Sequence, residues 1–357
     1  MIEITRYLLA AAVAQSHLWP KGQDWMGQIA VFAFYTLSGY LITRVLNDRY
    51  GFGWRGTGAF VLNRILRLAP AYYIILAIAL GALTVLPLQD FHFLIRMPAT
   101  PAEIVTNLTV IGQVTFDYRQ WISLAKPLIT SWSLSIELCC YLLLALYFAR
   151  TPARLWAFVI IGALAITAST GWCVAVDPTG YGPYCLQNRY GVIQAGFIPF
   201  AAGGLFYFHR PALTAWIGAR LKLLAIIFAL AWLSMFAGRW LSATVGPFLG
   251  IPFTYLLLTA AGDYRPTRLF DFFGRSSYHL FIAHMPIAAI LVTGFGLPPN
   301  KFVTMIASIA VALGLSAFLV PLEWRVEGLR RRVAGRHMAR AALPHAAAAP
   351  GTVDRAP

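Results

Sequence analysis

The first residues of the chain contain two groups that could do chemistry, an arginine and a histidine, in an otherwise apolar run. Arg6 and His17 stand eleven residues apart in the segment MIEITRYLLAAAVAQSH. In an α-helix, eleven steps of roughly 100° return to within about 20° of the starting direction and rise about 16 Å. Both side chains therefore lie on one helix face, which in a membrane span favours a buried reaction path over a plain anchor.

His17 is a candidate general base. Histidine ordinarily has a pKa close to neutral, so its ring can take a proton from a hydroxyl group near pH 7, as acyl transfer to an alcohol requires. The alternative role is structural, because the residue shortly precedes Trp19 and Pro20 at a predicted helix end, where a histidine can meet lipid headgroups. Position alone leaves both open.

Two further arginines occur in the segment FVLNRILRLAPAYY. Arg64 and Arg67 are three residues apart and share one ridge of a helix. Two guanidiniums in this arrangement can hold a pyrophosphate or a phosphorylated nucleotide from the cytoplasmic side. Arginines at a cytoplasmic helix end also anchor membrane spans without binding a ligand, and that alternative stays open.

A carboxylate stands inside the apolar run TSWSLSIELCCYLLL. Thr130, Ser133 and Glu137 are spaced by three and four residues, which places them on one polar stripe of a helix. Burying Glu137 in a membrane is expensive, which favours a functional role such as orienting a histidine and stabilising its imidazolium. It could instead be a packing strut, paired with an arginine or a tryptophan N–H.

The segment FGRSSYHLFIAHMPI adds further candidates. Ser277 and His284 are seven residues apart, so they lie on one helix face. Two histidines in one span, His279 and His284, are unusual, but a zinc site needs more cysteine or carboxylate ligands than are present, so we predict no metal site. Ser38 and Gly39, in AFYTLSGYLIT, are small residues that allow helices to approach closely.

Membrane helices must position these residues. The 357-residue chain is 59% hydrophobic and only 11% charged, with a mean hydropathy of +0.68, which excludes a soluble domain. We predict an all-α, polytopic integral membrane protein with about ten transmembrane helices and no cleaved signal peptide. The candidate spans are residues 4–20, 28–46, 68–88, 129–149, 155–176, 191–208, 221–240, 243–261, 276–296 and 301–321.

The distribution of charge orients these spans. Most of the 28 lysines and arginines fall on the side that contains both chain ends. Because positive charge concentrates in cytoplasmic connections, we predict that both termini are cytoplasmic. The net charge of +15 then reflects this bias and attraction to anionic membrane lipids, and it requires no nucleic-acid partner.

The chain divides into a transmembrane domain, residues 1–325, and a basic cytoplasmic tail, residues 326–357. We expect the tail to be partly disordered and to include a short amphipathic helix on the membrane surface. The outer connection 89–127 contains PAEIVTNLTVIGQ, too short to span and too apolar to be free in water, which predicts an interfacial or re-entrant helix. Spacing does not decide whether Cys173 and Cys185 form a disulfide.

Five motifs, in this order, resemble the membrane-bound acyltransferase-3 family over residues 4–332. The family's pattern of an arginine, ten residues and a histidine resembles Arg6 to His17, and its phenylalanine-rich LSG motif resembles FYTLSGYLI, which contains Ser38. Its arginine pair before a proline resembles Arg64, Arg67 and Pro70. Its tryptophan-serine-leucine-x-x-glutamate motif resembles Trp132 to Glu137, which includes Ser133, and its serine-tyrosine motif followed by a histidine resembles Ser277, Tyr278 and His284. Asn63 and Cys140 stand where the family usually has arginine and phenylalanine, and no aspartate precedes Arg6.

The resemblance implies a multi-pass O-acyltransferase of a bacterial inner membrane. Such enzymes move an acyl group, often acetyl, from cytoplasmic acyl-coenzyme A to a hydroxyl of a carbohydrate or another cell-envelope molecule, which suggests polysaccharide biosynthesis enzymes as partners. By this resemblance Arg6, Arg64 and Arg67 bind the donor, acetyl-coenzyme A in particular. His17 is then the catalytic base, and Glu137 orients nearby groups.

Six residues are assigned to support or to the pocket: Ser38, Trp132, Ser133, Ser277, Tyr278 and His284. Among these, Ser38, Trp132 or Tyr278 could donate a hydrogen bond to the developing oxyanion. Two other functions use the same polar groups. One is a ten-helix secondary transporter of a sugar, a lipid-linked substrate or an anion. The other is a catalytically silent protein that passes acyl groups to a separate transferase.

Overall fold

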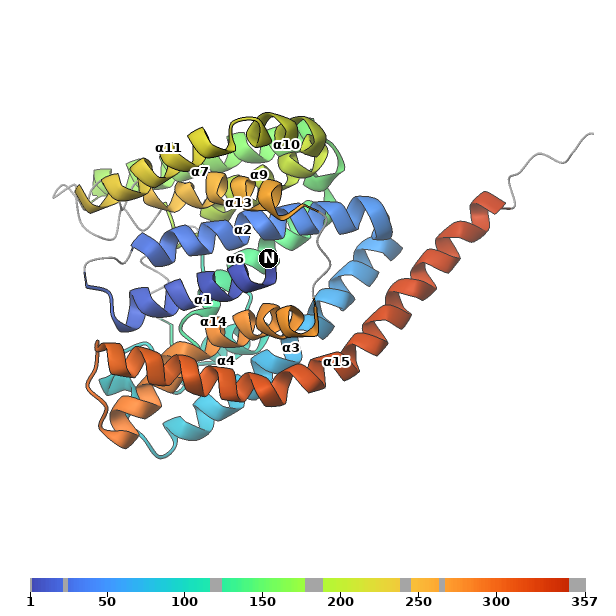
Figure 1. Ribbon diagram of the computed structural model, residues 1–357. Helices are drawn as coiled ribbons and strands as arrows, with labels where there is room; N and C mark the ends of the chain where they lie inside the picture. Colours follow the sequence, from blue (N-terminus) through green and yellow to red (C-terminus); the bar gives the residue numbers. More distant parts are fainter. Residues whose placement is uncertain are drawn as a thin grey trace, which may run out of the picture.

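The computed structural model describes residues 2–21, 25–115, 124–176, 189–237, 245–262 and 267–346. Within these ranges the chain is helical and contains no β-strand (Figure 1). The α-helices are α1 (Ile2–Leu18), α2 (Trp25–Val45), α3 (Trp54–Leu83), α4 (Pro101–Thr109), α6 (Ser131–Leu146), α7 (Pro152–Val176), α9 (Phe197–Phe208), α10 (Arg210–Gly218), α11 (Leu221–Ser234), α13 (Gly250–Ala261), α14 (Arg268–Phe295) and α15 (Phe302–Ala346).

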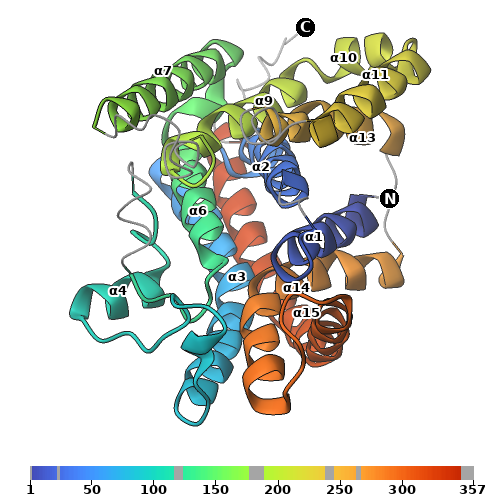
Figure 2. The ribbon, with the colours of Figure 1, turned by 90° about the vertical axis from the view of Figure 1, so that its left-hand side faces the viewer.

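Helices α1 and α2 lie side by side in the middle of the bundle (Figures 1 and 2). Helix α2 packs chiefly against α9, and α1 packs chiefly against α14. Helices α7, α10, α11 and α13 lie on the α9 side of this centre, whereas α3 and α15 lie on the α14 side.

Five helical segments within the described ranges are long and apolar enough to cross a membrane. They are Trp25–Tyr50, Trp54–Leu83, Pro152–Cys173, Arg268–Phe295 and Phe302–Gly328. A sixth span is possible if α10 and α11, which are bent by 84° at their junction, count as one. Three shorter apolar helical segments, Ser131–Leu146, Ile193–Phe208 and Gly246–Ala261, complete the set. Each of the ten apolar segments of the sequence thus contains a helix, although ten full spans are not established.

Three of the differences from the predicted helix boundaries concern α3, α14 and α15. Helix α3 begins at Trp54 rather than near residue 68, and Pro70 stands within it, because the arginines of its first half alternate with apolar residues and leave an amphipathic helix there. Helix α14 begins at Arg268 rather than 276. Helix α15 continues without a break to Ala346, so the start of the tail extends this helix instead of forming a separate one (Figure 1).

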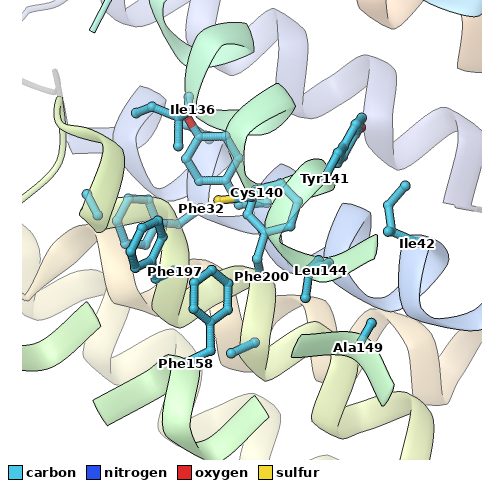
Figure 3. Packing of buried hydrophobic residues seen from close by; sticks show 14 of the residues in the cluster. Phe32, Ile42, Ile136, Cys140, Tyr141, Leu144, Ala149, Phe158, Phe197 and Phe200 are labelled. Atoms are coloured by element: carbon cyan, nitrogen blue, oxygen red, sulfur yellow. The ribbon is translucent and has the colours of Figure 1, made fainter. Parts of the chain in front are cut away.

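The largest hydrophobic core is an aromatic cluster between α2, α6, α7 and α9 (Figure 3). Phe158 stacks on Phe197 with ring centroids 4.5 Å apart, and both are buried. From α6, Ile136 and Cys140 point into this cluster. Such packing, rather than water exclusion, holds membrane helices together. It therefore fixes the rotation of α6 and turns Glu137 away from this aromatic cluster.

The close helix approach expected at Gly39 is present. A side chain added at Gly39 would collide with the backbone of Phe200 in α9, and one added at Gly203 would collide with the backbone of Thr36 in α2. These two glycines therefore set the spacing of α2 and α9, as small residues do at tight membrane-helix crossings.

Helix α4 is the short helix predicted in the outer connection. Thr100 and Glu103 form a capping box at its start. Burial alone would raise the pKa of Glu103, but hydrogen bonds from the backbone N–H groups of Ala99, Ala125 and Thr100, with a further one from the Arg96 guanidinium, lower it to about 2. The apolar face of α4 is exposed, as an interfacial helix requires.

Cys185, whose pairing with Cys173 the spacing leaves open, lies outside the described residues. Residues 347–357 of the predicted tail also lie outside them.

Candidate active site

Four helices, α1, α2, α6 and α14, enclose a seam that contains three cavities in succession. Each of the four helices contributes residues to every one of these cavities. Along α1 the order runs from Arg6, which lines the first and second cavities, to His17, which lines the third. The shared face that the sequence predicts for these two side chains is therefore the face that borders the seam.

The first of these, which we call the arginine cavity, brings together Arg6, Arg64 and Arg67 with Arg275 from α14. Neither Arg6 nor Arg67 forms an ion pair with a carboxylate among the described residues. The Arg6 Nε atom is buried without a hydrogen-bond partner. A site with several guanidiniums and few counter-charges suits an anion with several phosphate oxygens.

Glu137 lies in the arginine cavity and not beside His17. Its Oε1 atom accepts hydrogen bonds from Ser38 Oγ at 2.9 Å and from the hydroxyl of Tyr141, one turn further along α6. The carboxylate thus shares the cavity with the guanidiniums, although none of the ion pairs in the described part of the chain joins it to an arginine. Among the described residues no hydrogen bond joins Glu137 to a histidine.

The second cavity, the middle chamber, adjoins the arginine cavity and shares five lining residues with it. The shared residues are Arg6, Phe34, Ser38, Glu137 and Tyr278. Two of the candidate support residues, Ser133 and Ser277, also line it. Their hydroxyl groups donate to backbone carbonyls of their own helices, Ser133 to Thr130 and Ser277 to Gly274.

The third cavity, the histidine cavity, surrounds His17 at the far end of α1. It is the roomiest of the three, with about 370 Å³ open to the centres of water-sized groups. His17 is exposed to this space. The aromatic rings of Trp132 and Tyr190 meet edge to face on the wall, with their centroids 5.1 Å apart. The histidine therefore faces a cavity with polar and aromatic walls.

His284 is the hydrogen-bond partner of His17. The His17 Nδ1 and His284 Nε2 atoms are 2.9 Å apart, and the rings are nearly parallel. His284 Nδ1 lies 3.0 Å from the carbonyl oxygen of Leu280, which can only accept, so this nitrogen carries the proton. In two neutral rings His284 Nε2 then accepts from His17 Nδ1, which leaves a lone pair on His17 Nε2.

A second polar residue of the histidine cavity, His92, was not singled out in the sequence. Its Nδ1 atom accepts a hydrogen bond from the backbone N–H of Leu94 at 3.3 Å, so its Nε2 carries a proton. Burial lowers the pKa of His92, which keeps the ring neutral. His92 stands in a connection without helical periodicity, which explains why no sequence pattern drew attention to it.

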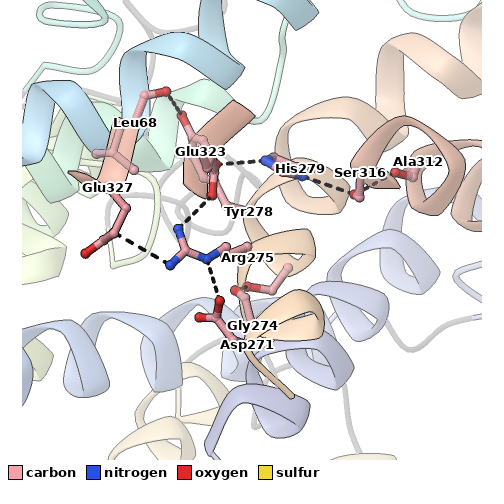
Figure 4. A network of polar contacts seen from close by, with 11 residues as sticks. Leu68, Asp271, Gly274, Arg275, Tyr278, His279, Ala312, Ser316, Glu323 and Glu327 are labelled. Carbon is pink, nitrogen blue, oxygen red and sulfur yellow. Dashed lines mark hydrogen bonds and ion pairs between the residues drawn. The ribbon is translucent and has the colours of Figure 1, made fainter. Parts of the chain in front are cut away.

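A network between α14 and α15 holds one wall of the arginine cavity (Figure 4). Arg275 pairs with Asp271 at 2.9 Å and with Glu323 at 3.5 Å. Glu323 also lies 3.0 Å from His279 Nε2. Nothing in the spacing of α14 and α15 shows that these residues meet, so sequence analysis missed Arg275 and Glu323. Tyr278 completes this wall by donating to the carbonyl of Leu68 in α3.

Two of the three departures from the family motifs, Asn63 and Cys140, have different surroundings. Asn63 is buried and is not among the residues that line the arginine cavity. Cys140 belongs to the aromatic core of Figure 3. Among the described residues no group of three histidine, cysteine or acidic side chains is arranged to hold a metal ion.

These features define the class of the protein. It is a helical membrane protein whose arginine cavity and paired histidine lie on one seam. A family model described as an acyltransferase domain matches residues 2–321. The chain belongs to acyltransferase family 3 and is, in general terms, a membrane acyltransferase. Comparisons with curated proteins and with solved structures found no match.

Proposed function

We propose that this protein moves an acyl group, acetyl in the simplest case, from acyl-coenzyme A to a hydroxyl of a carbohydrate or another cell-envelope molecule. The observation that carries the proposal is the His17–His284 pair, which leaves a basic nitrogen in a cavity on the same seam as the arginine cavity. A base suited to a hydroxyl and cations suited to a nucleotide are the two parts that such a reaction needs.

The donor binds with its phosphates in the arginine cavity. Arg64 and Arg67 hold the phosphate oxygens, and Arg6 contributes the unpartnered Nε–H. Glu137 limits the surplus of positive charge and keeps Ser38 and Tyr141 in place. The thioester end then points along the seam toward His17.

His17 acts as base and then as acid. Its Nε2 atom takes the proton of the acceptor hydroxyl while the hydroxyl oxygen forms a bond to the thioester carbonyl carbon. When the C–S bond breaks, the leaving thiolate takes that proton from the imidazolium, so protons and charge balance. Of the three candidate oxyanion donors, Trp132 lines the same cavity as His17, whereas the Ser38 and Tyr278 hydroxyls already donate to Glu137 and Leu68.

The proposed topology has ten spans and two cytoplasmic termini in a bacterial inner membrane. The five long segments, the bent α10–α11 pair, the three shorter apolar segments and α1 would supply these spans. Residues 1–325 form the transmembrane domain and 326–357 the tail.

Enzymes of polysaccharide biosynthesis are the proposed source of the acceptor. Family membership favours this function over the transporter. Reconstitution without other proteins separates it from a protein that only shuttles acyl groups.

Purified protein in lipid nanodiscs, given acetyl-coenzyme A and a panel of sugar alcohols, tests the proposal through release of free coenzyme A thiol. We expect His17→Ala to lower the acceptor-dependent rate by about 10²–10⁴-fold with folding unchanged. Arg220→Ala is the matched control, because Arg220 stacks on Trp216 away from the seam. Turnover that survives both His17→Ala and Arg67→Ala would refute the proposed roles.

The acceptor and the acyl group can be identified in cells. Mass spectrometry of surface glycans with and without the protein reports both masses at once. We expect an acyl mass that disappears when the protein is absent and when His17→Ala replaces it. An unchanged glycan profile would exclude these glycans as acceptors.

A further inference from the structure

The middle chamber lies where the thioester end of a donor must pass. It shares Arg6, Ser38 and Glu137 with the arginine cavity, so the two spaces adjoin. It shares no lining residue with the histidine cavity. A donor anchored by its phosphates therefore extends into the chamber first, and some part of the wall separates it from His17.

Phe281 forms the wall between the chamber and the catalytic pair. Its side chain lines the chamber, and its ring lies edge to face against His284 with centroids 6.5 Å apart. The Phe281 ring also meets Phe34, at 6.0 Å between centroids. The carbonyl of Phe281 accepts a hydrogen bond from Thr130, whose side chain lines the histidine cavity. One residue thus touches both sides of the partition.

The chamber is small. The centres of water-sized groups can occupy about 50 Å³ of it. One separate water needs roughly 10–15 Å³ of this space, so the chamber has room for only a few water-sized groups. A space of this size favours a short acyl group such as acetyl over a long one such as hexanoyl.

We propose that the middle chamber is the acyl-binding site and that Phe281, backed by Phe34, makes the donor site selective for short acyl groups. The inference rests on the proposed acyl-coenzyme A donor and deepens it. A short acyl group leaves room for the Phe281 ring to rotate and join the chamber to the histidine cavity. A longer chain presses on the ring and holds the partition closed, because packed interiors yield little space.

The rate of coenzyme A release from acetyl-, propionyl-, butyryl- and hexanoyl-coenzyme A tests this assignment. We expect wild-type protein to use acetyl-coenzyme A at least tenfold faster than hexanoyl-coenzyme A. In Phe281→Ala that ratio should fall at least tenfold, because the cavity left by the ring accepts the longer chain. Phe281→Leu, which keeps more of the volume and is the safer variant for folding, should shift the ratio in the same direction by less.

Phe273→Ala is the matched control. Phe273 lies on the same helix, packs against Tyr7 with ring centroids 5.2 Å apart, and lines none of the three cavities. The ratio of the acetyl-coenzyme A rate to the hexanoyl-coenzyme A rate in Phe273→Ala should equal that of wild type. A wild-type profile that is flat with chain length, or a ratio unchanged in both Phe281 variants, would overturn the assignment and leave the donor proposal intact. No turnover of any acyl-coenzyme A by wild type would overturn both.

Discussion

His17 and His284 form a hydrogen-bonded pair across the α1–α14 interface, with 2.9 Å between His17 Nδ1 and His284 Nε2. The chain of contacts continues from His284 Nδ1 to the carbonyl of Leu280. Because that carbonyl can only accept, the direction of both hydrogen bonds is set, and the outer nitrogen of His17 is left as a base. One backbone oxygen thereby selects the tautomer on which the proposed chemistry depends.

His284 is a positioning residue, and its removal should slow turnover without preventing binding. We expect His284→Ala to lower kcat roughly tenfold to a hundredfold, less than His17→Ala, with little change in KM for the acceptor. His284→Gln keeps a side-chain oxygen that can accept from His17 Nδ1, so it should recover part of the rate. The kcat–pH profile should also move in His284→Ala, which a purely structural role for His284 would not cause. A profile identical to wild type would contradict the assignment.

Arg67 should act on the nucleotide part of the donor. Loss of a charge-assisted hydrogen bond costs about 1.5–3 kcal/mol, so Arg67→Ala should raise KM for acetyl-coenzyme A by roughly 10- to 100-fold. With S-acetyl-pantetheine, which lacks the nucleotide, wild type and Arg67→Ala should have the same KM. Equal effects on the two donors would show that Arg67 does not contact phosphate. Arg220→Ala again serves as the control.

Glu137→Gln separates two roles for this residue. The amide oxygen can still accept from Ser38 and Tyr141, but the negative charge is lost from a cavity that contains four arginines. We expect a severalfold lower KM for acetyl-coenzyme A, because the cavity becomes more positive, with kcat nearly unchanged. A large fall in kcat at constant KM would instead support the role of orienting a histidine, as the sequence first suggested.

At acidic pH the free energy of unfolding should depend on the ionisation of Glu103. Its pKa in the folded protein is about 2, below its usual value of 4.5. A carboxyl group whose pKa is lowered by folding stabilises the fold when the pH is above the pKa of that group in the unfolded chain. This contribution disappears as pH falls from 4.5 toward 2. The shift corresponds to at most about 3 kcal/mol. We expect thermal unfolding of wild type in detergent to shift down over this range, and Glu103→Gln to be less stable at pH 7 with a flatter pH dependence.

Parallel pH profiles of the wild type and Glu103→Gln would contradict this prediction. Asp90→Asn, in the same outer connection, is a suitable control for a general effect of removing a carboxylate.

The sequence by itself determined what lies on one helix. The helical period places Arg6 and His17 on one face of α1, and it places Ser277 and His284 on one face of α14. Apolar runs predicted ten helical segments, and all ten contain helices in the structure. These are local properties, since backbone hydrogen bonding repeats every few residues whatever the neighbours are. The ordered motifs also predicted the family, which the family model confirms.

Only the tertiary structure decided which faces meet. The partner of His17 is His284 and not Glu137, and Glu137 instead shares a cavity with the arginines. Sequence spacing cannot show this, because the rotation of α6 depends on how Ile136 and Cys140 pack against α9, and helix contacts of this kind join residues far apart in the chain. The start of α3 was also missed, since hydropathy ends where arginines begin but the helical backbone does not. Local periodicity determines which residues share a helix face, whereas the cavities between helices arise from the packing of those faces.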